Sequence, residues 1–209
     1  MRILWVTFFV VLVDQISKLL VKGVSIPFLG LHIPGMRYGS SIPVLGDFFR
    51  LTYIENPGMA FGVDPGGKLF FSLFSIALSI GILYYLYHAR KAKFSLRFSL
   101  ALILGGAIGN MIDRTFYSAL FEDGPLFYGK VVDFFDVDFF DIYLWGFSLT
   151  RWPVFNVADA TVSVGIVLML LTQHHRETRP ERSSPPPSSH QQPEQGSAPR
   201  EEREETASS

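Results

Sequence analysis

The chain of 209 residues contains no cysteine. This absence excludes a disulfide framework, a thiol nucleophile and a cysteine metal site, so any chemistry has to use other groups. A strong net charge is also missing, because the formal net charge is -1 at pH 7, and without a basic field we expect no nucleic-acid partner. The five histidines lie outside any HExxH motif, and no GxSxG motif occurs, which disfavours a zinc peptidase and a serine hydrolase of that type.

Long apolar runs are the main feature that is present. Hydrophobic residues make up 48% of the chain, and a helix needs about 20 apolar residues to cross a bilayer. Asp14 and Lys18 interrupt the first run and no small-residue cleavage site follows it, so we interpret it as a retained helix rather than a cleaved signal peptide. The sequence therefore predicts an all-α membrane protein with four transmembrane helices, near residues 3–22, 68–88, 97–113 and 154–173.

The charges between these runs predict the orientation. The segment 88–97 carries four basic residues and no acid, whereas 115–152 carries Lys130 and Arg151 against six acidic residues. By the positive-inside rule, the short basic loop is cytoplasmic. Both termini are then expected in the cytoplasm, and the segments 23–67 and 115–153 on the outer face.

Two short motifs place an Asn three residues before an Asp. They are GNMIDR, with Asn110 and Asp113, and FNVADA, with Asn156 and Asp159. At 1.5 Å per residue both aspartates lie at a similar depth, about 24 Å and about 21 Å from the cytoplasmic ends of their helices. Because residues three apart share a helix face, two carboxylates and two amides are expected to converge between the helices.

An ionisable group at this depth is costly and is usually functional. The alternative is a helix cap, which suits Asp159 near the start of its helix and does not suit Asp113 at the expected end of the third helix. Two carboxylates close together in a low dielectric cannot both ionise easily, so one is protonated and one charged, as aspartyl proteolysis requires. A proton- or ion-coupled transporter and a non-catalytic membrane scaffold remain open on this evidence.

Five motifs in order carry a resemblance to a known family. They are DQISK with Asp14 and Lys18, NPGMAFG from Asn56, GGAIGNMIDR, GKVVDF from Gly129, and FNVADA, and together they span residues 1 to about 173. The chain resembles the lipoprotein signal peptidases (signal peptidase II), an aspartyl peptidase family of bacterial membranes. The resemblance implies removal of the signal peptide from diacylglyceryl-modified prolipoproteins just before the lipidated Cys, with Asp113 and Asp159 as catalytic residues. It also implies no metal or organic cofactor, and a site near the extracytoplasmic face of the cytoplasmic (inner) membrane.

The resemblance also implies a set of substrate-binding or supporting residues, each with a simpler alternative. Asp14 and Lys18, four residues apart, could neutralise one another, and Asn56 before Pro57 and Gly58 also fits a turn. Glycines in GGAIG are expected to let helices approach closely. The full set of supporting residues is Asp14, Lys18, Asn56, Asn110, Arg114 and Asn156.

The outer segments are expected to form a substrate platform. FFRLTYIEN alternates well enough for a strand and is bounded by Gly46 and Pro57, which predicts a small extracytoplasmic β-sheet on the membrane. The aromatic-rich segment 116–155 is expected to be an interfacial loop, and 115–128 resembles an insertion. Residues 1–175 then form the peptidase domain, while 176–209, rich in Pro, Ser, Gln and Glu, is expected to be a disordered cytoplasmic tail. Expected partners are the prolipoprotein substrate and membrane lipid, with a monomeric protein.

Overall fold

A computed structural model describes residues 1–58, 67–138, 142–144, 147–149 and 151–177. The described elements are the α-helices α1 (Leu4–Lys22), α2 (Gly67–His88), α3 (Phe94–Phe121) and α4 (Val157–Glu177), the 3-10 turns η1 (Pro27–Leu29) and η2 (Ala89–Lys91), and the strands β1 (Val24–Ile26), β2 (Leu31–Ile33), β3 (Ser41–Leu45), β4 (Phe49–Asn56), β5 (Val131–Val137), β6 (Ile142–Leu144) and β7 (Phe147–Leu149). Apart from its first two residues, the predicted tail lies outside the described residues.

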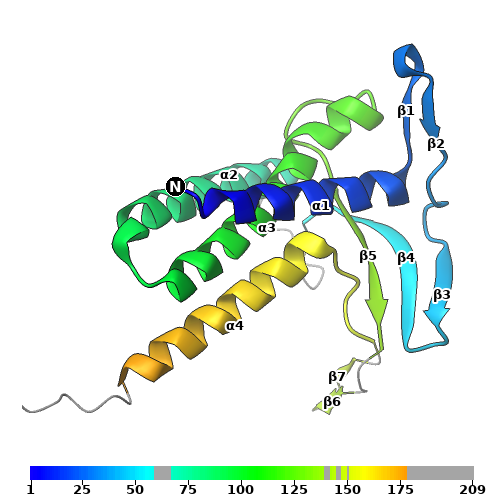
Figure 1. The fold of residues 1–209 in the computed structure, drawn as a ribbon. Helices are drawn as coiled ribbons and strands as arrows, with labels where there is room; N and C mark the ends of the chain where they lie inside the picture. Colours follow the sequence, from blue (N-terminus) through cyan, green and yellow to red (C-terminus); the bar gives the residue numbers. More distant parts are fainter. Residues whose placement is uncertain (59–66, 139–141, 145–146, 150, 178–209) are drawn as a thin grey trace, which may run out of the picture. The chain divides into compact units, whose positions relative to one another are not determined.

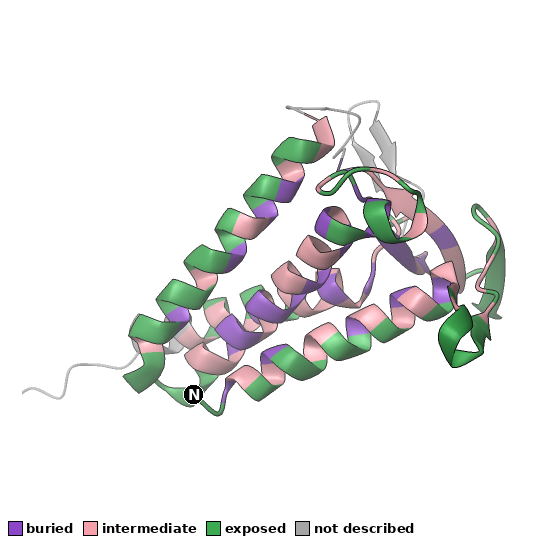
Figure 2. Ribbon diagram, turned by 90° about the horizontal axis from the view of Figure 1, so that it is seen from above, coloured by how far each residue is buried: buried purple, intermediate pink, exposed green. Residues whose placement is uncertain are grey.

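Three of the described helices are long and apolar enough to cross a membrane: α1, α2 with η2, and α3. Their outward faces carry exposed large apolar side chains such as Phe8, Leu73 and Tyr84, as lipid contact requires, and Figure 2 shows exposed stripes along the helices. The structure confirms that these three predicted segments form helices long and apolar enough to cross a membrane. The apolar part of α4, Val157–Thr172, is shorter than the other three, so the fourth span stays a prediction.

The third helix is longer than the sequence predicted. It begins at Phe94 and continues two turns past Asp113 to Phe121. No Gly or Pro occurs between Asp113 and Gly124, and the chain turns only at Asp123, whose φ is 49°. The prediction that Asp113 lies at the end of this helix is therefore wrong. Because Asp113 lies inside the helix, the helix dipole no longer disfavours a structural role for its carboxylate.

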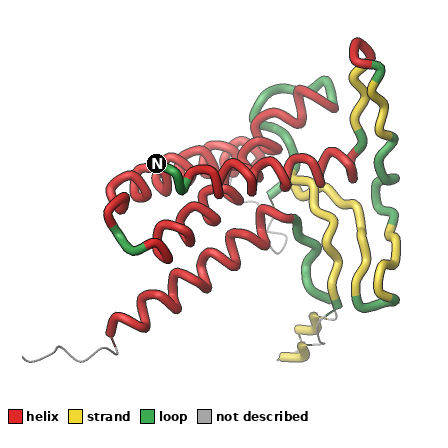
Figure 3. The backbone as a smooth tube through the Cα atoms, in the orientation of Figure 1, coloured by secondary structure: helices red, strands yellow, loops and turns green. Residues whose placement is uncertain are grey.

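The sheet lies at one end of the helices (Figures 1 and 3). Strands β3, β4 and β5 form an antiparallel sheet in that order, and β4 confirms the predicted strand. The prediction of one interfacial loop over 116–155 is wrong, since this segment contains the end of α3 and the strands β5, β6 and β7. Strand β5 is buried along nearly its whole length, so its sequence lacks the alternation that marks a half-exposed strand.

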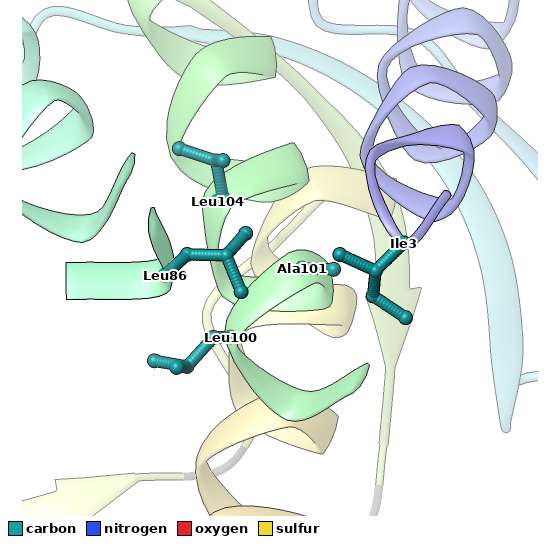
Figure 4. Packing of buried hydrophobic residues seen from close by; sticks show 5 residues of the cluster. All are labelled: Ile3, Leu86, Leu100, Ala101 and Leu104. Atoms are coloured by element: carbon teal, nitrogen blue, oxygen red, sulfur yellow. The ribbon is translucent and has the colours of Figure 1, made fainter. Parts of the chain in front are cut away.

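Glycines bring α3 into close contact with its neighbours, as predicted. A Cβ atom at Gly105 would lie 2.7 Å from Cβ of Val10 on α1, and one at Gly106 would lie 2.6 Å from Cγ2 of Val162 on α4. Figure 4 shows the apolar cluster at the other end of the helices, where Leu86 of α2 lies on one side of α3 and Ile3 lies on the other side, next to Ala101. These contacts fix the relative positions of the helices that carry the buried polar groups.

Candidate active site

Buried polar side chains from α1, α3, β5 and the start of α4 meet in one cluster. The N-terminus of α4 is built as a capping box: the Asn156 side-chain oxygen accepts from the Asp159 N–H at 2.9 Å, and Asp159 Oδ2 accepts from the Asn156 N–H at 3.3 Å. Asp14 of α1 accepts from the Ala158 N–H at 2.9 Å. Asp159 therefore does take part in a helix cap, as one alternative predicted. Its other carboxylate oxygen, Oδ1, is available for further contacts.

Lys18 is fully buried between two helices. Its Nζ lies 2.8 Å from Asp14 Oδ2 and 2.8 Å from Asp113 Oδ2, and it donates to the Asn110 side-chain oxygen at 2.9 Å. The pairing of Asp14 with Lys18 exists as the sequence suggested. It is one part of a larger network, because the same ammonium group also compensates the charge of Asp113.

Asp113 is fully buried and has a complete set of partners. Besides Lys18, it accepts from the Gln15 side-chain amide at 2.9 Å and from the Val132 N–H at 3.2 Å. Tyr117 in turn donates to the oxygen of Gln15 at 3.1 Å. These contacts hold α1, α3 and the beginning of β5 together.

Asn110 connects the two predicted aspartates. Its amide donates to Asp159 Oδ1 at 2.8 Å, and its oxygen accepts from Lys18, the partner of Asp113. The same oxygen accepts from the Asn156 amide at 3.2 Å. The predicted convergence of two amides and two carboxylates thus exists. The two aspartates are connected indirectly, because Asp113 contacts Lys18, Lys18 donates to Asn110, and Asn110 donates to Asp159.

Asp133 of β5 is the site residue that sequence reasoning missed. Its side chain is 2% exposed, and it accepts from the Asn156 amide at 2.5 Å. Burial, followed by the nearby charge of Asp159, raises the pKa of the Asp133 carboxyl to about 7. The amides of Asn156 and Asn56 and the charge of Lys18 act in the opposite direction and only partly offset this rise.

Gln15, which donates to Asp113, is a second residue that was not predicted, and the sequence held signals for it and for Asp133. Asp133 lies in GKVVDF, and Gln15 lies in DQISK next to Asp14. Both motifs carried the family resemblance. What the sequence could not provide was the pairing of β5 with β4, which places Asp133 opposite Ile54 and next to the start of α4.

A cavity of about 510 Å³ opens beside Asp159. Its polar wall contains Asn110, Arg114 and Ser75, and Arg114 Nη1 donates to Ser75 Oγ at 3.2 Å. Among the described residues, buried Nε of Arg114 finds no acceptor. The rest of the lining is mainly apolar and comes from α2, α3 and α4: Phe70, Phe71, Phe74, Leu78, Ile103, Gly106, Ala107 and Val162.

Asn56, the last of the predicted supporting residues, lies at the end of β4. Its side-chain oxygen accepts from the Gly58 N–H at 2.9 Å, which is the turn that the sequence suggested. Its amide also helps to lower the pKa of the Asp133 carboxyl. Asn56 therefore lies in the cluster and shapes the turn after β4.

Helices that enclose buried carboxylates beside an apolar cavity suit an intramembrane hydrolase, and the comparisons with known proteins separate this class from a transporter. Residues 6–174 match the family model described as signal peptidase (SPase) II. The chain is 36% identical over 171 residues to the lipoprotein signal peptidase of Desulfitobacterium hafniense strain DSM 10664 / DCB-2, covering 81% of this chain and 91% of the relative. It is 36% identical over 166 residues to that of Halothermothrix orenii, with 79% and 90% covered.

Solved structures agree on the fold. A bacterial membrane enzyme determined by the in meso method at 2.3 Å resolution superposes with a TM-score of 0.63 at 24% identity, covering 88% of this chain and 93% of that one. A second, at 1.9 Å, gives a TM-score of 0.59 at 26% identity, with 82% and 92% covered.

The chain belongs to the signal peptidase II family. It is an aspartic-type peptidase of the bacterial membrane, and its relatives give the transporter alternative no support.

Proposed function

We propose that this protein removes the signal peptide from diacylglyceryl-modified prolipoproteins by hydrolysing the peptide bond just before the lipidated Cys. Its curated relatives are named lipoprotein signal peptidases. The apolar cavity between α2, α3 and α4 offers space for part of the signal peptide, and its polar wall lies next to Asp159. The diacylglyceryl chains would lie in lipid against the helices, so the depth of the site in the membrane fixes the position of the cut.

The pair that carries the reaction in this proposal is Asp133 and Asp159. The supporting observation is that both contact Asn156, Asp133 through the amide and Asp159 through the N-cap. With a pKa of about 7, Asp133 holds a proton at neutral pH over much of the population. Asp159 is then the ionised partner, and the two carboxylates differ in protonation as aspartic catalysis requires.

The reaction follows from these two states. Asp159 takes a proton from a water molecule, and the resulting hydroxide attacks the carbonyl carbon of the scissile bond. The proton on Asp133 hydrogen bonds to the carbonyl oxygen and stabilises the negative charge that develops there. The proton now on Asp159 passes to the leaving nitrogen, the C–N bond breaks, and the signal peptide leaves as a free carboxylate.

Asp113 is the partner of Asp159 that the family resemblance suggested. In the structure the charge of Asp113 is matched by Lys18 at 2.8 Å, and its carboxylate also accepts from the Gln15 amide and the Val132 N–H. We therefore assign Asp113 a positioning role, because it binds the Val132 N–H next to Asp133. Lys18 and Asp14 support this arrangement from α1, while Asn110 and Asn156 orient Asp159 and Asp133.

Arg114 is proposed as a substrate-binding residue. Its side chain lines the cavity together with Asp159, and its Nε is buried without an acceptor among the described residues. A guanidinium group in this position can donate to a backbone carbonyl of the bound signal peptide. Asn56 would hold the turn after β4 and the Asp133 side chain in place.

The proposal includes the topology predicted from the charges. Helix α4 would be the fourth span, because its 21 residues extend about 31 Å at 1.5 Å per residue. Both termini would be cytoplasmic, and the sheet β3–β4–β5 and the active site would lie near the extracytoplasmic face. The protein would act as a monomer, since both carboxylates come from one chain.

The direct experiment is incubation of purified protein in lipid with a synthetic diacylglyceryl prolipopeptide, followed by mass measurement of the products. The expected masses correspond to hydrolysis just before the lipidated Cys. The same peptide without the lipid is the control and should be cleaved poorly. An intact lipopeptide after prolonged incubation with folded protein would reject the proposal.

A further inference from the structure

A small hairpin leaves the end of α1 and belongs to no other sheet among the described residues. It consists of β1 and β2 joined by the turn η1. Figure 1 shows that it runs across the end of α1 instead of continuing the helix axis, and that it projects beyond α1 on the side away from α4. Figure 2 shows most of it as exposed.

The two faces of the hairpin differ in chemistry. The strand register pairs Val24 with Ile33, Ser25 with His32 and Ile26 with Leu31. Directly paired residues point to the same face, and successive pairs alternate between faces. One face therefore carries Val24, Ile26, Leu31 and Ile33, and the other carries Ser25 and His32.

The turn η1 at the tip of the hairpin also carries exposed apolar side chains. Phe28 is 86% exposed and Leu29 is 64% exposed. No residue from Gly23 to Gly35 is Asp, Glu, Lys or Arg. Exposed aromatic and aliphatic side chains without nearby charge are costly in water, so this surface needs an apolar partner.

Two glycines fix the direction of the hairpin at its base. Gly23 and Gly35 have φ angles of 85° and 68°, and a Cβ atom at Gly23 would lie 2.8 Å from the carbonyl oxygen of Pro34. The Met36 N–H donates to the Val21 carbonyl at 2.7 Å, so the returning chain is tied to the last turn of α1. The hairpin is thus held at the level where the membrane span ends.

We propose that this hairpin docks on the surface of the lipid bilayer next to α1, with Phe28, Leu29 and the apolar face in the interfacial layer and Ser25 and His32 toward water. Lipid is the expected partner because the hairpin is continuous with a helix that is long and apolar enough to span the membrane. The hairpin begins at Val24, two residues after Lys22, the end of this helix, and it runs across the helix. A Phe at the tip of an uncharged segment suits the boundary between headgroups and acyl chains. The hairpin would fix the depth and tilt of α1, which carries Asp14 and Lys18.

The lack of cysteine in the chain makes a direct test possible. Single variants Phe28→Cys and Ser25→Cys are labelled with a polarity-sensitive fluorophore and reconstituted into phosphatidylcholine–phosphatidylglycerol vesicles. The label at position 28 is expected to emit at shorter wavelength, to be quenched by lipids with a nitroxide near the headgroup, and to be protected from aqueous iodide. The label at position 25, on the polar face of the same hairpin, should be quenched by iodide and less by the nitroxide lipids.

Three results would overturn the proposal. One is equal iodide quenching at both positions in vesicles. Another is protection at position 28 that appears only at high protein-to-lipid ratio together with energy transfer between labelled copies, which would indicate docking of a second copy. The third is protection that appears only after substrate lipopeptide is added, which would make the hairpin a substrate contact. None of these readouts depends on peptidase activity, so they are independent of the proposed reaction.

Discussion

The Asn156 amide donates a hydrogen bond of 2.5 Å to the carboxylate of Asp133, while the other end of the same side chain caps the N–H of Asp159. One asparagine therefore holds a strand carboxylate and a helix carboxylate in one arrangement. This explains why an Asn lies three residues before Asp159: the spacing is that of a capping box, and the free amide of the capping residue points to the second acid.

The pH dependence of cleavage should report the Asp133 proton. Because its pKa is raised to about 7, Asp133 is protonated below that pH and can stabilise the carbonyl oxygen, and it loses this ability as the pH rises above it. We expect kcat/KM to fall on the alkaline side with a midpoint near this value. The measurement is the initial rate of lipopeptide cleavage in nanodiscs, with the intactness of the protein checked at each pH. A flat profile from neutral to clearly alkaline pH would contradict the assignment.

Helix packing predicts opposite results for two glycines. A Cβ atom at Gly106 would collide with the Ala158 carbonyl oxygen and with Val162, whereas the space around Gly81 of α2 is open. Gly106→Ala should destabilise the protein by about 1–3 kcal/mol through overpacking. Gly81→Ala should be neutral or stabilise by up to about 1 kcal/mol through helix propensity. Thermal unfolding in detergent checks both, and equal effects of the two changes would argue against close α3–α4 packing.

Glu55 of β4 links the sheet to α1 at the edge of the membrane. It pairs with Lys22 and with Lys130 at 3.1 Å, and it accepts from the Tyr53 hydroxyl at 2.6 Å. Burial alone would raise the pKa of Glu55, but the hydrogen bonds from Lys22 and Tyr53 outweigh it and lower the pKa to about 2. We expect Glu55→Gln to cost about 1.5–3 kcal/mol, since these are hydrogen bonds to a charged group.

The pH dependence of stability provides a second readout for Glu55. Its folded pKa lies below the usual value of 4.5, so its contribution is fully present above that pH and is lost as the pH falls toward about 2. The matched control is Asp47→Asn, which removes an exposed pair with Arg50 and should cost under about 1 kcal/mol. The measurement is the unfolding midpoint of both variants across this pH range. A Glu55→Gln protein as stable as the control would contradict a stabilising role for the contacts of Glu55 with Lys22, Tyr53 and Lys130.

Membrane orientation can be tested with single cysteines. Ser95 lies in the basic segment 88–97 and Ser40 precedes β3, and the charge asymmetry places them on opposite sides. In intact cells a cysteine at Ser95 should resist an impermeant thiol reagent, and one at Ser40 should react. Labelling at Ser95 with protection at Ser40 would invert the topology.

The parts of the fold that follow from local sequence were predictable. The limits of α1 and α2 differ from the predictions by one residue at their starts, because length and apolar composition determine a membrane helix. Strand β4 was predictable from its alternation between turn residues. The pairs Asn110–Asp113 and Asn156–Asp159 could be found because helical spacing places each pair on one face.

The parts that depend on long-range contacts were not predictable. Strand β5 lies against β4 and α1, is buried on both faces and has no alternation, so its sequence resembles an aromatic loop. The site role of Asp133 depends on that pairing. The extension of α3 past Asp113 and the charge pairing of Asp113 with Lys18 also require the tertiary structure.

The central claim is that Asp133 and Asp159 form the reacting pair and that Asp113 positions them. The most direct test is product formation by purified, folded Asp133→Asn, Asp159→Asn and Asp113→Asn variants at saturating lipopeptide. The first two changes keep the side-chain volume and remove a proton-transfer group, so each should reduce turnover by about 10²- to 10⁴-fold or more, and the double variant should lose little beyond either single one. Asp113→Asn should retain residual turnover with an alkaline limb still near pH 7. Near-normal cleavage by a folded Asp133→Asn protein would contradict the account and return the catalytic role to Asp113.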